Sequence, residues 1–401
     1  MKKFEKLQRA FGAIFLVAGT TIGAGMLAFP VMTGIAGFFP AIILFAIVWL
    51  FLTFSAFLFL EVNLCFPKDT NMVTMADKTL GKWGKYVCIV TYVLLLYSLV
   101  SAYLSGGAGV MHVLFDGMGF ALPFWTETLL FVLLFGSAIY IGVKGVDFIN
   151  RAFMLGLVVC YLALLFFATP HLNLNLLTNF NPKYLWLALS VVITAFGFHI
   201  IIPTLKDYLE GDVKKLKTTL LIGSLVPFVV YLIWNFVILA ILPRGTLLQA
   251  YTTGVLPIES LKSILNAPTF LIFVSFFSFF AIVTSFLGVS LSLADFLADG
   301  LQIKKNNRGR FILCLLIFIP PLVFVLSGQK GFYIALEYAG AFVAILLGIL
   351  PCLMALKNRK QHRKLKFKMF GGKGLRYLAI AFFSLVIVVN ILQQFGYISL
   401  T

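Results

Sequence analysis

The sequence predicts an all-α polytopic membrane protein, and three observations lead to this fold class. Hydrophobic residues make up 61% of the 401 positions and charged residues only 11%, well outside the usual balance of soluble domains. The mean hydropathy is +1.05. Apolar runs long enough to cross a hydrocarbon core as helices recur along the whole chain. The eleven expected spans are residues 10–36, 39–64, 86–114, 122–143, 149–168, 184–205, 218–242, 268–294, 311–327, 332–356 and 376–396.

The placement of the charges predicts the topology. The net charge is +17, and when loops are assigned alternately to two sides, all but four of the 31 Lys and Arg residues share the side of the N-terminus. The four exceptions are Lys183, Arg244, Lys262 and Lys330. Because basic residues gather in cytoplasmic loops, we expect a cytoplasmic N-terminus and an external C-terminus. The cluster at 357–376 also suits anionic headgroups, so the expected partner is the lipid bilayer, with no nucleic acid.

The first span contains a stretch that is unsuited to a continuous helix, GTTIGAGMLAFP at 19–30. Pro30 has no N–H to give to the carbonyl of Met26, and the glycines further weaken the helix. Close helix packing through GxxxG is the alternative, but Gly23 and Gly25 point to different sides of a helix. An opened backbone survives in a membrane only where protein, water or a ligand takes its hydrogen bonds. We therefore expect one wall of a binding site, made of Gly19, Thr20, Thr21, Ile22, Gly23, Ala24 and Gly25.

Spans two and three carry polar residues within apolar sequence. Glu61, at the end of span two, is either an interfacial acid or a proton-linked or gating residue. In span three, Tyr97 and Ser98 lie mid-span and are candidates for a pocket wall, whereas tyrosines near span ends are more often interfacial anchors. Three histidines outside the expected site have no partner cluster in the sequence; they are His112, His171 and His362.

The sixth span repeats the pattern of the first, with ITAFGFHIIIPTL at 193–205. Gly197 weakens the helix, and Pro203 leaves the carbonyl of His199 without its usual donor. Interrupted helices at matching positions of two halves are typical of transporters built from inverted repeats, with the substrate at the breaks. The expected division is 1–168 for the first repeat, 184–356 for the second, 357–375 for a basic cytoplasmic loop and 376–396 for the eleventh span.

Two further groups complete the candidates. His199 is either a hydrogen-bonded structural histidine or a site residue that can titrate near neutral pH. In span eight, Thr284 and Ser285 either back-bond to their own helix or face the first break, where they would coordinate a cation or orient substrate. The outer run PIESLKSIL at 257–265 is a candidate lid.

Three of these motifs together resemble a known family. GTTIGAGMLAFP, FGFHIIIPTL and TSFLGVSLSLADFLADG are similar to the span-one, span-six and span-eight motifs of the bacterial hydroxy/aromatic amino acid permeases, the tyrosine and tryptophan permease family. The resemblance covers essentially the whole chain and is strongest to tyrosine permeases. It implies a LeuT-type five-plus-five inverted-repeat fold with an eleventh transmembrane helix, in the bacterial inner membrane with a periplasmic C-terminus. It also implies import of an aromatic amino acid by proton symport. FHIIIPTL is more branched than expected for the family, which leaves open a tryptophan or broader neutral amino acid permease.

A site at the two breaks has to hold a zwitterion and a ring. Free N–H groups near Gly25 would receive the carboxylate, and carbonyls between Gly19 and Ile22 the ammonium. The ring would lie against Phe196 and Phe198 and in the space left by Gly23 and Gly197.

Coupling has two candidate ions and needs no other cofactor. His199 and Glu61 are the expected proton-linked residues, and a sodium ion held by Thr284 and Ser285 is the rival. An enzyme is not expected, because HExxH and GxSxG are missing from the sequence. A channel would require a continuous polar stripe through one span, and the polar positions here are sparse. The sequence gives no indication of oligomeric state.

Overall fold

The computed structural model describes residues 2–120, 122–304, 306–328, 331–361 and 365–398; Lys330 and His362 lie outside these ranges. Within them, every regular element is a helix. Ten helices are long and apolar enough to cross a membrane, and a pair bent by 47° at a short break brings the total to eleven. The all-α polytopic fold class predicted from the sequence is confirmed.

The spans follow one another in chain order, and two of them are interrupted. The first span consists of α1 (Lys2–Thr21), the 3-10 helix η1 (Ala24–Ala28) and α2 (Phe29–Gly34). The sixth consists of α8 (Leu185–Ala195), the 3-10 helix η5 (His199–Ile201) and α9 (Ile202–Tyr208). The tenth joins α15 (Gly331–Val343), the π-helical η6 (Ala344–Ile349) and α16 (Leu350–Lys360). The others are α3 (Phe38–Asn63), α5 (Lys82–Gly117), α6 (Phe124–Ile141), α7 (Val143–Ala168), α10 (Val213–Leu239), α13 (Pro268–Gly300), α14 (Asn307–Leu326) and α17 (Gly372–Gln394).

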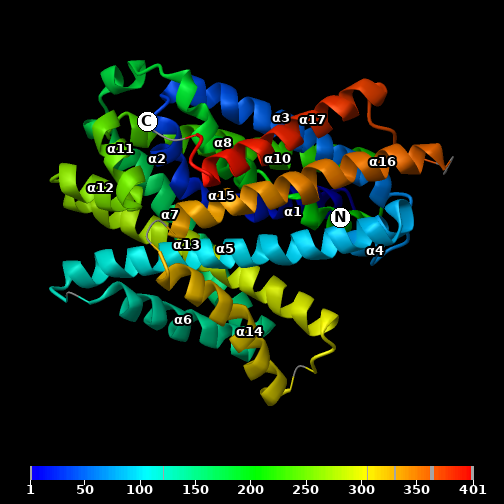
Figure 1. Ribbon diagram of the computed structural model, residues 1–401, viewed down its shortest axis with the longest axis horizontal. Helices are drawn as coiled ribbons and strands as arrows, with labels where there is room; N and C mark the ends of the chain where they lie inside the picture. The colour runs from blue at the N-terminus through cyan, green and yellow to red at the C-terminus, as the bar shows by residue number, and fades with distance from the viewer. Residues whose placement is uncertain (1, 121, 305, 329–330, 362–364, 399–401) are drawn as a thin grey trace.

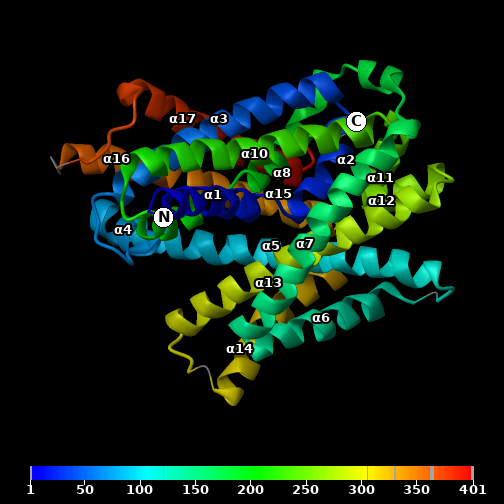
Figure 2. The same cartoon turned by 180° about the vertical axis from the view of Figure 1, so that it is seen from behind.

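Short helices lie between the spans. They are α4 (Met72–Leu80), η2 (Thr169–His171), η3 (Leu174–Thr178), η4 (Pro182–Tyr184), α11 (Arg244–Thr253) and α12 (Pro257–Ile264). The chain termini lie toward opposite ends of the long axis, with α4 beside the N-terminus and α11 and α12 near the C-terminus (Figure 1). The same arrangement is seen from behind in Figure 2.

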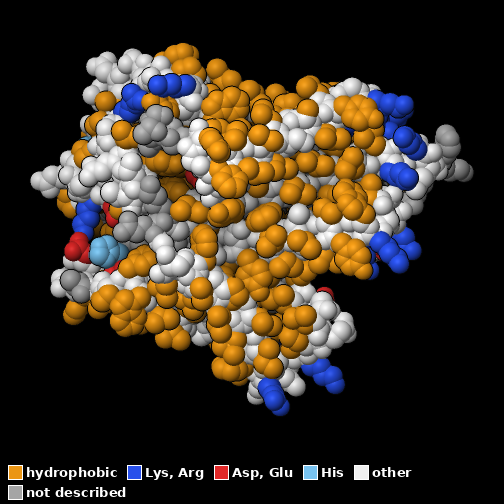
Figure 3. Space-filling view, viewed as in Figure 1, with side chains coloured by type: hydrophobic (Ala, Val, Ile, Leu, Met, Phe, Trp, Pro, Cys, Tyr) orange, Lys and Arg blue, Asp and Glu red, His pale blue; other side chains and the backbone are white. Residues whose placement is uncertain are grey.

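The two ends of the bundle differ in charge. Hydrophobic side chains cover the middle of the molecule, and Lys and Arg gather at the end that holds α16, with fewer at the other end (Figure 3). We call the end with α4, α16 and the start of α17 the basic end, and the end with α11 and α12 the opposite end. An apolar band between polar ends is what a membrane-spanning bundle requires.

The interrupted spans lie inside the bundle. The helix α13 packs against α5, α7 and η1, while α15 packs against α5 and α8, and α1 packs against α10. The crossing of α15 over α8 is so close that a Cβ on Gly340 would lie 2.1 Å from the carbonyl oxygen of Ser190. Such approach is possible only because glycine has no side chain. The unwound segments are therefore enclosed by neighbouring helices.

Candidate functional site

The first break opens two residues after α1 ends. Ile22 still donates to the carbonyl of Ala18 at 2.8 Å, and Gly23 then adopts an extended conformation. Pro30 is the second residue of α2, and the carbonyl of Met26, which it cannot serve, accepts instead from the N–H of Phe29. Among the described residues, the N–H groups of Gly23 and Gly25 find no acceptor. Backbone donors that are available inside a bundle can bind an anionic group.

The second break is built in the same way. The helix α8 ends at Ala195, and a 3-10 turn leads into α9, whose second residue is Pro203. The carbonyl of His199, which Pro203 cannot serve, accepts from the N–H of Ile202. Both interruptions expected from the glycine and proline pattern are confirmed, and in each a 3-10 hydrogen bond replaces the lost helical one.

Tyr231 of α10 joins the two breaks. Its buried hydroxyl lies 2.5 Å from the carbonyl oxygen of Thr21 and 3.1 Å from that of Ala195. Thr21 and Ala195 are the last residues of α1 and α8. One hydroxyl therefore hydrogen-bonds to the carbonyl at each of the two helix ends where the chain unwinds. A buried carbonyl without a donor is costly. Tyr231 was not among the residues predicted from the sequence, because nothing around it distinguishes it from other tyrosines in the spans.

Ser285 of α13 holds the first break from the other side. Its Oγ accepts a 3.0 Å hydrogen bond from the N–H of Ala24. A Cβ on Gly23 would lie 2.7 Å from the same Oγ. Of the two alternatives for span eight, Ser285 faces the break, whereas Thr284 back-bonds to the carbonyls of Phe280 and Ala281.

The second break has aromatic and aliphatic neighbours. The ring of Phe196 is fully buried and packs 5.1 Å from that of Tyr231, so protein already covers part of the proposed substrate wall. A Cβ on Gly197 would lie 2.9 Å from Leu347 Cδ1 in the π-helical segment. The ring of Phe198 lies 5.5 Å from that of His199.

His199 is enclosed without a polar partner. It is 0% exposed, and neither ring nitrogen has a hydrogen-bond partner among the described residues. The aromatic rings of Phe59 and Phe198 are its neighbours. Hence the alternative of a hydrogen-bonded structural histidine is not what this conformation contains. An unpaired buried imidazole is costly unless a ligand, a proton or water reaches it.

Tyr97 and Ser98 line a different hollow. Together with Pro320, Phe324 and Tyr338 they face a space of about 390 Å³ between α5, α14 and α15. The Tyr97 hydroxyl donates to the carbonyl of Leu316 at 3.0 Å. Residues of the two breaks do not line this hollow, so the structure does not bring Tyr97 and Ser98 to the breaks.

Glu61 lies at the basic end in an ion pair. Both of its carboxylate oxygens accept from the guanidinium of Arg359, and Oε2 also accepts from the N–H of Met369 at 2.7 Å. Arg359 in turn donates to the carbonyl of Met369. The carboxylate is fully buried, so this pair joins α3 to α16 and to the chain before α17. The partner of Glu61 is 298 residues away in sequence, beyond the reach of local pattern.

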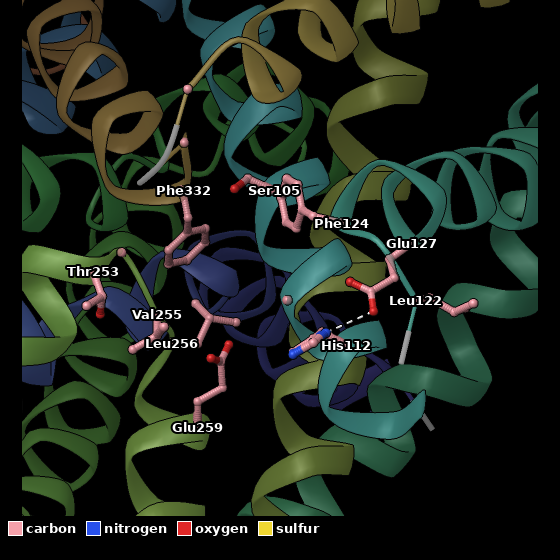
Figure 4. Close-up of a pocket in the computed structure, with 14 residues that line it drawn as sticks. Ser105, His112, Leu122, Phe124, Glu127, Thr253, Val255, Leu256, Glu259 and Phe332 are labelled. Carbon is pink, nitrogen blue, oxygen red and sulfur yellow. Dashed lines mark hydrogen bonds and ion pairs between the residues drawn. The ribbon is translucent and has the colours of Figure 1, made fainter. Parts of the chain in front are cut away.

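A cavity of about 380 Å³ opens at the opposite end, between α5, α6, α12 and the start of α15. His112 Nδ1 lies 2.9 Å from Glu127 Oε1, and the carboxylate of Glu259 faces the same cavity (Figure 4). His112 therefore has a partner, in contrast to what the sequence suggested. Burial raises the pKa of Glu259, with the charge of His112 acting in the opposite direction.

The expected lid residues form a helix beside this cavity. Leu256 and Glu259 line it, and the Tyr333 hydroxyl donates to the carbonyl of Val255 at 2.8 Å. This bond ties the segment before α12 to the tenth span. Within the described ranges, no group of three His, Cys, Asp or Glu side chains is arranged to hold a metal ion.

Comparisons with known proteins agree with this architecture. The profile of the tryptophan/tyrosine permease family matches residues 6–391. The chain is 36% identical over 374 residues to "Tyrosine-specific transport system 1" of Haemophilus influenzae, covering 91% of this chain and 92% of that protein. It is 32% identical to "Tyrosine-specific transport system 2" of the same organism, with 97% and 98% covered. A "Tryptophan-specific transport protein" of Haemophilus influenzae is 30% identical, with 98% and 97% covered.

A solved structure shares the fold. The manganese transporter of Eremococcus coleocola, crystallised with an aromatic bis-isothiourea substituted compound, superimposes with a TM-score of 0.61 at 13% identity. The match covers 98% of this chain and 89% of the transporter. At this identity the likeness concerns the arrangement of helices alone.

Proposed function

The chain belongs to the tryptophan/tyrosine permease family, and we propose that it imports an aromatic amino acid, tyrosine in the first place, across the bacterial inner membrane by proton symport. The family match and the transport names of the relatives support the substrate class. Tyrosine is favoured over tryptophan because the two relatives at 36% and 32% identity carry tyrosine-specific names.

The proposed substrate site lies between the two breaks, and the observation that carries it is the Tyr231 hydroxyl shared by their carbonyls. The free N–H groups of Gly23 and Gly25 would receive the substrate carboxylate. The carbonyl of Ile22, which accepts no hydrogen bond among the described residues, would receive the ammonium. Because Tyr231 occupies the carbonyl of Thr21, that oxygen is the less available acceptor.

The substitution Gly23→Val tests the site. The valine side chain at position 23 would overlap with Ser285 Oγ. Uptake of labelled tyrosine into proteoliposomes should therefore be lost, while the amount of expressed protein stays the same. Gly288→Val is the matched control, because Gly288 is exposed on α13 and a Cβ there meets nothing within 4 Å. Unchanged uptake by the Gly23 variant would remove the site assignment.

The two interrupted spans also support an inverted-repeat architecture of the LeuT type, with residues 1–168 and 184–356 as its halves and α17 as the added helix. Each break ends an α-helix, continues as a 3-10 turn and enters a short helix whose second residue is proline. Such paired discontinuous helices hold substrates near the membrane midplane. Alternating access would then move one group of helices against the other around the breaks.

The proposed topology places the basic end in the cytoplasm. Lys and Arg gather there (Figure 3), as in cytoplasmic loops of bacterial membrane proteins. The N-terminus would be cytoplasmic and the C-terminus periplasmic, and the cavity with His112 and Glu259 would open outward. Accessibility of a cysteine introduced at Ser263, in the exposed part of α12, to a membrane-impermeant thiol reagent in intact cells would test this orientation.

Proton coupling is proposed with His199 and Glu61 as candidates. One proton carried inward adds about 2.3 kcal/mol per 100 mV, roughly a 40-fold accumulation. The unpaired His199 beside the second break supports a coupling role, whereas the ion pair of Glu61 favours a gate at the basic end that opens when the pair with Arg359 breaks. Ser285 Oγ already accepts from the N–H of Ala24 and Thr284 bonds back to its own helix, which favours a positioning role for Ser285 over sodium binding by the pair.

Gradients imposed on proteoliposomes distinguish the coupling ions. Uptake should follow an inward proton gradient in the absence of sodium, and His199→Gln should uncouple it while substrate exchange continues. If uptake follows a sodium gradient at fixed pH and does not respond to a pH gradient, the coupling ion is sodium rather than the proton. Ionic current far above the substrate flux would instead indicate a channel.

Competition by each unlabelled aromatic amino acid in the same assay would define the preferred substrate.

A further inference from the structure

A second large cavity lies at the basic end, away from the proposed transport site. It has a volume of about 940 Å³ and is formed mainly by α16, α17 and residues 368–370 before α17. Leu80 at the end of α4 and Trp83 at the start of α5 close one side. Among the described residues, six cationic side chains line it and no Asp or Glu does. The six are Lys357, Arg359, Lys360, Lys368, Lys373 and Arg376.

Among the described residues, the two arginines of the cavity differ in their hydrogen-bond partners. Arg359 is paired with Glu61 and also donates to the carbonyl of Met369. Arg376 is 4% exposed, and its Nε and Nη1 are buried with no hydrogen-bond partner among the described residues. A buried guanidinium without acceptors is strongly unfavourable. Since Arg376 lines the cavity, its missing acceptor is expected to come from an anion in that cavity.

The rim of the cavity is suited to an amphiphile rather than to a small soluble anion. Trp83 is 59% exposed, Tyr377 58% and Phe370 74%, and all three line the cavity. Trp and Tyr side chains at span ends lie at the level of lipid headgroups. The start of α17, which bears Tyr377, continues into a helix whose outward residues are apolar, so acyl chains could extend along it from a headgroup at Arg376.

We propose that this cavity binds the phosphate headgroup of an anionic phospholipid from the membrane leaflet at the basic end. Arg376 is the central ligand, because a guanidinium donates two parallel hydrogen bonds to phosphate oxygens. Lys368 and Lys373, both exposed, add electrostatic attraction from the open side. This inference does not depend on which amino acid is transported.

Binding there has a structural consequence. The lipid would join α16 to α17 across the chain that contains Met369, and this chain is held by the Glu61–Arg359 pair. The headgroup would thus neutralise the cation next to that ion pair, since Arg376 lies within electrostatic reach of both Arg359 and Glu61. Docking of the eleventh span onto the bundle is the feature that the lipid would strengthen.

The experiment measures lipid binding directly. The full-length protein, delipidated in a neutral detergent, is titrated with phosphatidylglycerol or phosphatidylcholine of equal chain length, and bound lipid is followed by native mass spectrometry together with the thermal unfolding midpoint. Inorganic phosphate and glycerol 3-phosphate form a separate arm. The variants are Arg376→Gln and the double change Lys368→Gln, Lys373→Gln; the control is Arg308→Gln, an exposed cation at the start of α14.

The expected result is preferential retention of phosphatidylglycerol and a higher unfolding midpoint with it than with phosphatidylcholine. Arg376→Gln should weaken phosphatidylglycerol binding about tenfold or more, and the lysine pair, which cannot disturb the buried structure, should weaken it by a smaller factor. Arg308→Gln should have no effect. Equal binding of both lipids, binding unchanged in all variants, or full stabilisation by soluble phosphate alone would each overturn the assignment to a phospholipid.

Discussion

The two broken spans open by the same backbone device but have different surroundings. At the first break, Ser285 accepts from the N–H of Ala24, and two glycine N–H groups remain available. At the second break, Gly197 lies against Leu347, and Phe196 packs among aromatic rings. The Tyr231 hydroxyl bonds to a carbonyl of each break.

This difference assigns different tasks to the two breaks. Available backbone donors favour an anionic group, so the first break is suited to the charged part of an amino acid. Close apolar packing limits the volume beside the second break, so it is suited to selecting the shape of the side chain. A zwitterion with an aromatic ring needs both kinds of surface within one molecule's length, and Tyr231 keeps the two breaks together.

The largest expected effect comes from Gly23→Ala. A Cβ 2.7 Å from Ser285 Oγ forces the serine away from Ala24, and overpacking of this kind costs about 1–3 kcal/mol. Uptake should fall below detection in a proteoliposome assay. Adding Ser285→Ala should restore part of it by relieving the clash, whereas Gly25→Ala alone, with an ordinary 3.5 Å contact to Ala195, should keep substantial uptake. Equal loss in both single variants would show that the serine contact is not decisive.

Tyr231→Phe should have the next largest effect. It leaves two buried carbonyls, those of Thr21 and Ala195, without their shared donor, at a cost of about 1–3 kcal/mol. A lower thermal midpoint and about a tenfold loss of uptake are expected. Tyr161→Phe is the matched control, because that hydroxyl donates to a single carbonyl, that of Val230, which belongs to neither break. If both variants lose the same stability and uptake, Tyr231 has no special role.

Gly197→Ala should be milder than Gly23→Ala. The new Cβ would lie 2.9 Å from Leu347 Cδ1, the end of a flexible side chain that can move. We expect a change in the apparent KM and in the order of preference among aromatic substrates, with the maximal rate less affected. Leu347→Ala in the same chain should reverse the change. A complete loss of uptake that Leu347→Ala does not relieve would contradict the division of tasks between the breaks.

The smallest expected effect concerns Glu259 at the opposite end, outside both breaks. Burial raises the pKa of its carboxyl above the ordinary value of 4.5. Its protonated form therefore stabilises the fold at pH below 4.5, and this contribution is lost as the pH rises through the raised pKa. Glu259→Gln should unfold at a higher temperature than the parent protein at neutral pH, and the difference should vanish in acid. A difference independent of pH would exclude this cause.

Much of the fold followed from local features of the sequence. Composition and run length predicted the spans, and Pro30 and Pro203 predicted where two helices open, because proline removes a hydrogen bond at a position fixed by its own place in the chain. Thr284 and Ser285 were expected together, either bonding back to their own helix or facing the first break. Ser285 faces the break and Thr284 bonds back to its helix.

Other parts of the site could not be predicted because their partners are distant in sequence. The hydroxyl of Tyr231 serves carbonyls 210 and 36 residues away, and Glu61 pairs with an arginine 298 residues away. His112 likewise has a partner on the next span. The place of Tyr97, which faces α14 rather than the breaks, depended on the rotation of α5 about its axis.

The sequence by itself determined that this chain is a bundle of apolar helices and that two of them are interrupted, since hydrophobicity and the missing proline N–H act within a few residues. Only the tertiary structure decided which side chains meet at those interruptions. Helix rotation and packing are set by contacts among many spans at once, and a single hydroxyl can then satisfy two backbone carbonyls that the chain itself leaves far apart.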